Sequence, residues 1–88
     1  MKLVFDERAW QDFTYWLSAD PKLASRIVAL IADTVRSPFR GLGKPEPLRG
    51  NLSGFWSRRI DDQHRLVYRV IGKGADQRLE IAQCRFHY

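Results

Sequence analysis

The periodicity of the apolar residues differs between two long parts of this chain, and the difference limits what the chain can fold into. Over residues 7–36 the apolar residues recur at helical spacing, and after residue 54 they alternate as in β-strands. The segment 37–54 between them is rich in glycine and proline, which continue neither pattern. The sequence therefore predicts an α+β fold in which a helical part packs against a sheet.

Two helices are expected in the first part, over about 7–18 and about 21–36. Asp6 stands at the N-cap position of the first helix, and Asp20-Pro21 marks the start of the second. Their predicted apolar stripes are Trp10, Phe13, Trp16 and Leu17 in the first helix, and Leu23, Ile27, Leu30, Ile31 and Val35 in the second. Because the link between them is short, we expect an antiparallel hairpin with both stripes in the core.

Strands are expected on both sides of this hairpin. Their predicted positions are Met1 to Phe5, a short strand near Pro47-Leu48-Arg49, then 55–60, 64–71 and about 78–87. In the run 64–71, one face carries Leu66, Tyr68 and Val70, and the other carries Arg65, Val67 and Arg69. The sequence thus predicts one domain over 1–88 with the order β-α-α-β-β-β-β. The helical hairpin covers one face of a mainly antiparallel sheet, and the other face is concave and basic.

Composition excludes several classes of protein. The one cysteine, Cys84, cannot form an internal disulfide, which argues against a disulfide-stapled secreted scaffold and fits a reducing cytosol. Cys84 is expected in the core. Residues 1–20 hold no apolar signal-peptide segment, and no apolar run is long enough for a membrane helix. We therefore expect a cytoplasmic protein with no membrane association.

Positive charge is concentrated in the middle of the chain. Residues 40–69 hold seven Lys and Arg residues against three acidic ones, and so carry +4 of the net +5. The predicted RNA- or ribosome-binding residues are Arg40, Lys44, Arg49, Arg58, Arg59 and Arg69. Arginine binds phosphate bidentately and stacks on bases, so this segment favours a nucleic-acid partner. The alternative is a basic surface that only confers solubility.

Four residues together suggest cleavage of RNA, whose 2′-hydroxyl can serve as the nucleophile. Glu46, held between two prolines, is the predicted base, and Arg65 is placed to stabilise charge on the phosphate. His87 is the predicted acid, and Tyr88 could hydrogen-bond or stack on a base. The plainer alternatives are a charged loop residue, a surface ion pair and a frayed chain end. The histidines and the cysteine show no metal-ligand spacing, and no nucleotide-cofactor motif is present.

Several motifs resemble one family. They are Lys44-Pro45-Glu46-Pro47-Leu48, the run from Asn51 to Ile60, His64-Arg65-Leu66-Val67-Tyr68, and the terminal Cys84-Arg85-Phe86-His87-Tyr88. In this order they closely resemble the YoeB toxins of the RelE/ParE superfamily, over essentially the whole chain. The resemblance implies a RelE-like microbial RNase fold and a metal-independent endoribonuclease of a type II toxin–antitoxin system. Such an enzyme enters the 70S ribosome and cuts mRNA in the A site, which inhibits translation.

The resemblance also implies site residues and partners. The family's base matches Glu46, its phosphate-stabilising arginine matches Arg65, and its catalytic histidine and tyrosine match His87 and Tyr88. A YefM-type antitoxin and a homodimer are implied as well, and no cofactor is. Two departures are a longer turn over 72–77 and a phenylalanine, Phe86, where a tyrosine is expected.

Two other functions share some of these features. A ParE-like toxin has the same fold but inhibits DNA gyrase by binding it, without nuclease activity. A non-catalytic RNA-binding module would explain the basic and aromatic residues. Neither of them needs an acid–base set, so the combination of Glu46, Arg65, His87 and Tyr88 favours the enzyme.

Overall fold

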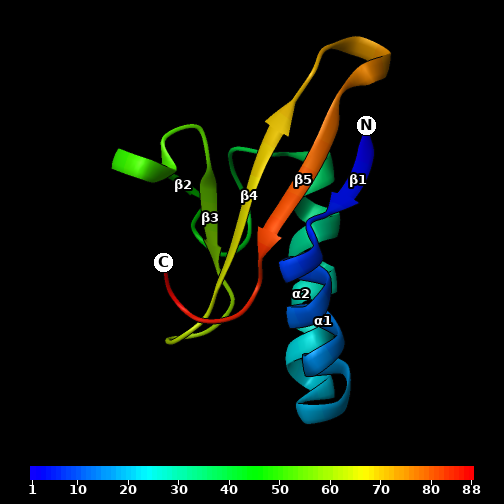
Figure 1. Ribbon diagram of the computed structural model, residues 1–88, viewed down its shortest axis with the longest axis vertical. Helices are drawn as coiled ribbons and strands as arrows, with labels where there is room; N and C mark the ends of the chain where they lie inside the picture. The colour runs from blue at the N-terminus through cyan, green and yellow to red at the C-terminus, as the bar shows by residue number, and fades with distance from the viewer.

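The protein is a five-stranded sheet with two helices packed against it, seen in a computed structural model that describes residues 1–88 (Figure 1). The elements are β1 (Lys2–Phe5), α1 (Glu7–Ala19), α2 (Pro21–Arg36), β2 (Glu46–Pro47), β3 (Trp56–Arg59), β4 (Arg65–Ile71) and β5 (Arg78–Gln83). Across the sheet the order is β1-β5-β4-β3-β2, with β1 parallel to β5 and all other pairs antiparallel. The predicted β-α-α-β-β-β-β arrangement is confirmed.

Both helices begin where the sequence predicts, but only one is capped by a side chain. The Asp20 carboxylate accepts a hydrogen bond from the Leu23 N–H at 3.2 Å, and Pro21 takes the first position of α2. Asp6 holds the N-cap position of α1 with an extended backbone, but its side chain makes no capping hydrogen bond. Neither helix is long and apolar enough to cross a membrane.

The helix faces that enter the core differ from the predicted stripes. The buried residues are Ala9, Asp12 and Trp16 in α1, and Ala24, Ile27, Leu30, Ile31 and Thr34 in α2. Trp10 and Leu17 were expected in the core, yet they are 54% and 52% exposed. The small Ala9 lies in the core instead, because it lets α1 approach the sheet closely: its carbonyl oxygen is 3.6 Å from the Cys84 sulfur. Val35 is likewise exposed.

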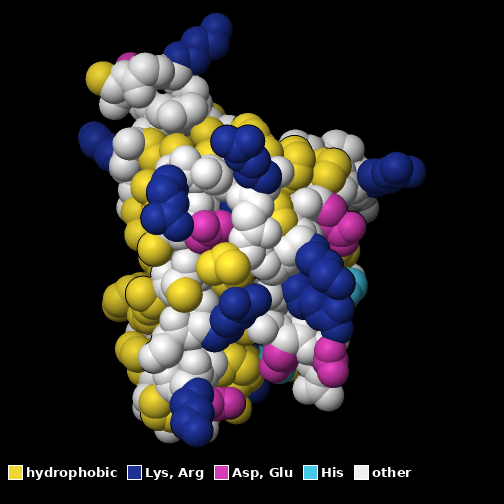
Figure 2. Space-filling view, turned by 180° about the vertical axis from the view of Figure 1, so that it is seen from behind, with side chains coloured by type: hydrophobic (Ala, Val, Ile, Leu, Met, Phe, Trp, Pro, Cys, Tyr) yellow, Lys and Arg dark blue, Asp and Glu magenta, His cyan; other side chains and the backbone are white.

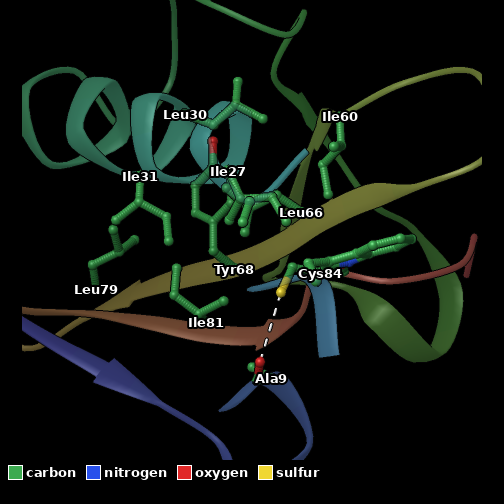
Figure 3. Close-up of a cluster of buried hydrophobic side chains, with 12 residues drawn as sticks. Ala9, Ile27, Leu30, Ile31, Ile60, Leu66, Tyr68, Leu79, Ile81 and Cys84 are labelled. Carbon is green, nitrogen blue, oxygen red and sulfur yellow. Dashed lines mark hydrogen bonds between the residues drawn. The ribbon is translucent and has the colours of Figure 1, made fainter. Parts of the chain in front are cut away.

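The core forms where α2 crosses the middle strands (Figure 3). Its main residues are Ile27, Leu30 and Ile31 of α2, Leu66 and Tyr68 of β4, Leu79 and Ile81 of β5, together with Trp16, Ile60 and Cys84. Leu66 and Tyr68 face the helices, as the alternation predicted. The other face of β4 therefore presents Arg65, Val67 and Arg69.

A β-bulge explains how Cys84 reaches the core. Strict alternation would place Cys84 on the face opposite Ile81. However, Val67 pairs with Gln83 and Tyr68 pairs with Ile81, so Ala82 is an extra residue in β5. The extra residue reverses the alternation, and Cys84 is fully buried with Ile81, as expected for a core cysteine.

Candidate active site

A polar pocket of about 140 Å³ lies beside β2, β3 and the start of β4. It is lined by Lys44, Glu46, Ser57, Arg59 and Arg65, with no hydrophobic residue among them. Ser57 and Arg59 flank the buried Arg58 in β3, and therefore point to the face away from the core. The fold thus brings together four residues that the sequence singled out and adds Ser57, which it did not.

Glu46 stands on a backbone segment with little freedom. It pairs with Ser57 in the two-residue strand β2, between Pro45 and Pro47, and its side chain is exposed at the pocket. Lys44, just before this segment, has a φ of 52°, in the left-handed region that most side chains avoid. The turn at Lys44 therefore aims both side chains at one space.

Arg65 reaches the same pocket from the start of β4. Its Nη1 donates to the carbonyl oxygens of Asp61 at 2.7 Å and His64 at 3.0 Å. These two bonds fix the guanidinium, while Nε and Nη2 donate to no protein group. Two N–H groups on one edge are thus free for a bidentate contact with an anion such as phosphate.

The last residues do not continue the final strand, contrary to the prediction of a strand over 78–87. β5 ends at Gln83, and the chain then leaves the sheet and passes the start of β4 towards β3 (Figure 1). Phe86 makes this change of direction with a φ of 68°. The departure from the strand is what brings His87 and Tyr88 to the other side of the sheet.

Tyr88 contacts Glu46, the predicted base. Its hydroxyl donates to Oε1 of Glu46 at 3.3 Å and lies 3.3 Å from Oγ of Ser57. His87 is exposed beside it: the two rings are 4.5 Å apart, and His87 Nδ1 lies 3.3 Å from the Tyr88 carbonyl oxygen. Glu46 and Arg65 therefore line one pocket, Tyr88 contacts two of the side chains that line it, and the His87 ring packs beside Tyr88.

Two residues of α1 hold the terminal segment in place, and neither was predicted from the sequence to do so. Asp12 accepts a hydrogen bond from the Cys84 N–H at 3.1 Å, and the indole of Trp16 donates to the Cys84 carbonyl at 2.9 Å. These two side chains bond the backbone N–H and carbonyl of Cys84, which neighbouring strands would have bonded if β5 had continued. The available signal was Asp12 itself, a carboxylate at helical spacing from Ala9 and Trp16 on the buried face.

The remaining predicted binding residues are spread over the surface. Arg40 and Arg49 are exposed, and Arg59 is paired with Asp62 at the rim of the pocket. Arg69 pairs with Glu80 at 2.9 Å and lies 4.9 Å from the Phe55 ring centroid. Figure 2 shows the same mixture on one face, where Lys and Arg side chains are scattered and acidic side chains lie beside several of them.

Arg58 does not fit the prediction that it contacts RNA, because it is fully buried. All three of its nitrogens donate inside the protein, at 2.6 to 3.2 Å. The acceptors are Tyr68 Oη, Asp33 Oδ2 and the carbonyl oxygens of Ser37, Arg40 and Leu42. Arg58 therefore ties the loop after α2 to β3 and has no donor left for a phosphate.

The carboxylate beside Arg58 is strongly stabilised in its charged form. The Leu42 N–H, then Arg58 and Arg36, donate to Asp33 and lower its pKa from the usual 3.8 to about 2. Gly41 makes this approach possible, because a Cβ at its position would overlap the Asp33 carboxylate. The loop that leads to Lys44 and Glu46 thus depends on an ion pair between the buried Arg58 and the partly buried Asp33.

Cys84 and the histidines offer little alternative chemistry. Burial, and then the charge of Asp12, raise the pKa of the Cys84 thiol to about 12, so it is not a nucleophile near neutral pH. No three His, Cys, Asp or Glu side chains are grouped so that they could hold a metal ion.

Residues 5–88 match the model of a protein family described as the YoeB-like toxin of bacterial type II toxin–antitoxin systems. The toxin YoeB of Escherichia coli K12 is 54% identical over 88 residues, which is the full length of both chains. Sequence similarity therefore covers the pocket and the terminal segment alike.

Solved structures of YoeB proteins are also similar to this chain over its whole length. A YoeB/ParE toxin from Agrobacterium tumefaciens has a TM-score of 0.96 and 53% identity, with all of both chains covered. A Staphylococcus aureus YoeB in a heterotetrameric YoeB–YefM complex has a TM-score of 0.87 and 38% identity, covering 100% of this chain and 98% of that one. YoeB from Staphylococcus aureus has also been solved as a dimer, with a TM-score of 0.88, 38% identity and the same coverage.

Proposed function

The chain belongs to the YoeB-like toxins of bacterial type II toxin–antitoxin systems, and we propose that it is a ribosome-dependent endoribonuclease that cuts mRNA in the A site. The observation that carries this proposal is the contact between Tyr88 and Glu46, 42 residues apart in sequence, at a pocket that also holds Arg65. A protein that only bound RNA would not need a carboxylate among the cations of its binding surface.

The geometry suggests one role for each residue. Glu46 takes the proton of the 2′-hydroxyl, whose oxygen then attacks the adjacent phosphorus. The free edge of Arg65 stabilises the negative charge that builds on the phosphate oxygens. His87 gives a proton to the departing 5′-oxygen, which leaves a 2′,3′-cyclic phosphate and a 5′-hydroxyl. Tyr88 holds the Glu46 carboxylate in the free protein and stacks on or hydrogen-bonds the nucleotide in the complex.

The exposed cations would supply affinity rather than chemistry. Lys44 and Arg59 flank the pocket, while Arg40, Arg49 and Arg69 are exposed further away. Contacts of such residues with phosphates position the protein on the ribosome and the mRNA, and their strength falls with salt. The place of action that follows from this target is the cytoplasm.

Two partners besides the ribosome follow from the family. We expect a YefM-type antitoxin with an acidic segment that covers part of the surface over 40–69, which holds six basic residues besides the buried Arg58 and three acidic ones. We also expect a homodimer, as solved for the Staphylococcus aureus relative.

The test is a cell-free translation reaction with a defined mRNA, in which the cut ends are mapped by primer extension. Cuts within the A-site codon that disappear without ribosomes would support the proposal. Intact mRNA together with blocked DNA supercoiling would instead identify a gyrase inhibitor. Intact mRNA with tight RNA binding and no effect on gyrase would identify a binding module.

A further inference from the structure

Two hydrogen bonds at the start of β4 hold the residue that precedes His87 and Tyr88. Nδ1 of His64 accepts from the Phe86 N–H at 2.7 Å, and the Arg65 N–H donates to the Phe86 carbonyl at 3.1 Å. Phe86 lies outside every strand, yet both of its backbone polar groups are bonded. We refer to this pair of bonds, made by His64 and Arg65 to Phe86, as the clamp.

The clamp holds a backbone conformation that the residue would otherwise avoid. Phe86 and Lys44 are the two non-glycine residues with a positive φ, and each directly precedes a segment of the candidate active site. Such conformations persist when the surrounding structure fixes them. The Phe86 side chain is 50% exposed, so core packing does not supply that constraint, whereas the clamp acts on the backbone itself.

His64 is well placed to hold its partner. Its ring packs edge-on against Trp16, with centroids 4.8 Å apart, and its backbone N–H donates to Oδ1 of Asp61 at 2.7 Å. A backbone N–H can only donate, so Nδ1 of His64 carries a lone pair and the neutral ring has its proton on Nε2. His64 is half-buried and does not line the pocket.

We infer that His64 is a positioning residue for RNA cleavage: its Nδ1 fixes Phe86 so that His87 and Tyr88 emerge beside Glu46. The inference rests on the proposed function, because it assigns a role within that reaction. His64 itself touches neither the RNA nor the reacting atoms. Its task is to keep Tyr88 within hydrogen-bond reach of the Glu46 carboxylate of β2, with the His87 ring beside Tyr88.

Two substitutions separate the acceptor from the ring. His64→Phe keeps an aromatic ring against Trp16 but removes the acceptor. His64→Asn keeps an acceptor close to the position of Nδ1 but removes the ring. The readouts are single-turnover cleavage on mRNA-programmed ribosomes, ribosome co-sedimentation, thermal unfolding, and hydrogen exchange of the Phe86 amide measured by NMR.

For His64→Phe we expect cleavage to fall by roughly 100-fold, because a displacement of about 1 Å at reacting groups costs this much. Its ribosome binding and thermal midpoint should stay close to wild type, while the Phe86 amide exchanges at least about tenfold faster. For His64→Asn we expect cleavage within about fivefold of wild type and a protected Phe86 amide, because the hydrogen-bond acceptor remains.

The inference is wrong if His64→Phe cleaves at the wild-type rate or leaves Phe86 protected. It is also wrong if His64→Phe fails to fold, or if both variants lose cleavage in proportion to lost stability, since His64 would then support the whole fold rather than position the terminal residues. A wild-type protein that does not cut mRNA would overturn the proposed function instead. In that case the exchange of Phe86 would still report whether His64 holds the terminal segment.

Discussion

Two arginines on neighbouring strands, Arg58 in β3 and Arg65 in β4, have opposite surroundings although both belong to the basic stretch of the chain. Arg58 faces the helices, is fully buried and donates five hydrogen bonds inside the protein. Arg65 faces the other side of the sheet and donates from Nη1 only. The guanidinium of Arg58 therefore stabilises the fold, whereas Nε and Nη2 of Arg65 remain free to bind a ligand.

The difference lies in the partners of each side chain. A buried guanidinium is tolerated only when its charge is paired and its N–H groups are bonded, and Asp33 with three carbonyl groups provides this for Arg58. A guanidinium at a pocket needs two partners to fix its position and free N–H groups to act on a phosphate. Stability and activity should therefore respond separately to changes at the two faces of the sheet.

The largest effect is expected on the open face. Glu46→Gln keeps the size of the side chain but removes the proposed base, so cleavage should fall by ~100- to 10,000-fold. Because Glu46 is exposed, thermal stability should hardly change. Glu7→Gln, at an exposed carboxylate in the first turn of α1, is the matched control and should cleave normally. A loss below about threefold for Glu46→Gln would mean that Glu46 is not the base.

The buried face should give the opposite result. Arg58→Met takes the buried partner from Asp33, which keeps only Arg36 and the Leu42 N–H, and leaves three carbonyl groups without their donor. This should lower the free energy of unfolding by about 3–5 kcal/mol. Arg65→Met should change it by less than about 1 kcal/mol, because the side chain lies near the surface and only its Nη1 is bonded to the protein, yet should abolish cleavage. Urea unfolding of both variants checks the comparison. Equal destabilisation by the two substitutions would contradict it.

Low pH should also weaken the hydrogen-bond network of Arg58 and Asp33, but by less than the Arg58→Met substitution. Because the folded pKa of Asp33 is about 2 and its usual value is 3.8, its ionised form is favoured by folding. This contribution is complete above about pH 4 and is lost as the pH falls through about 2. Urea unfolding from pH 5 to pH 2 should show the fall, and Asp33→Asn should make it shallower. An identical pH dependence in this variant would exclude Asp33 as a cause.

The smallest effect is expected for Ser57, which lies in the pocket but has no proton-transfer role in the proposed reaction. Ser57→Ala removes a contact of about one hydrogen bond to Tyr88, which is worth ~0.5–1.5 kcal/mol. Cleavage should thus fall by roughly two- to tenfold. Ser53→Ala, in an exposed turn, is the control. A loss as large as that of Glu46→Gln would show that Ser57 takes part in the chemistry.

Part of this comparison could be predicted from the sequence, because alternation correctly assigned the two faces of β4, whereas Arg58 was wrongly predicted to contact RNA and Trp10 and Leu17 to lie in the core. The element order and the grouping of Glu46 with Arg65 follow from local patterns and from the family resemblance. The alternation in β3 also indicates that Arg58 is buried. Arg58 alternates with Trp56 and Ile60, and thus shares the core-facing side of β3 with two apolar residues.

Other features depend on contacts between distant residues and leave no local pattern. The bulge at Ala82 and the left-handed turn at Phe86 decide where the chain end lies, yet both interrupt a regular alternation. The partners that stabilise this path, Asp12, Trp16 and His64, come from α1 and from the start of β4. Alternation alone therefore extends the last strand too far.

The central claim is that the terminal pair completes a cleavage site built on the open face of the sheet. Its most direct test compares the full chain with a form that ends at Phe86, by ribosome co-sedimentation and by A-site cleavage. The shortened form should fold and bind ribosomes normally, because its core, the clamp and the exposed cations remain, but its cleavage should fall by at least about 100-fold. Cleavage at a near-normal rate would contradict the account, since His87 and Tyr88 would then be only an ordered chain end.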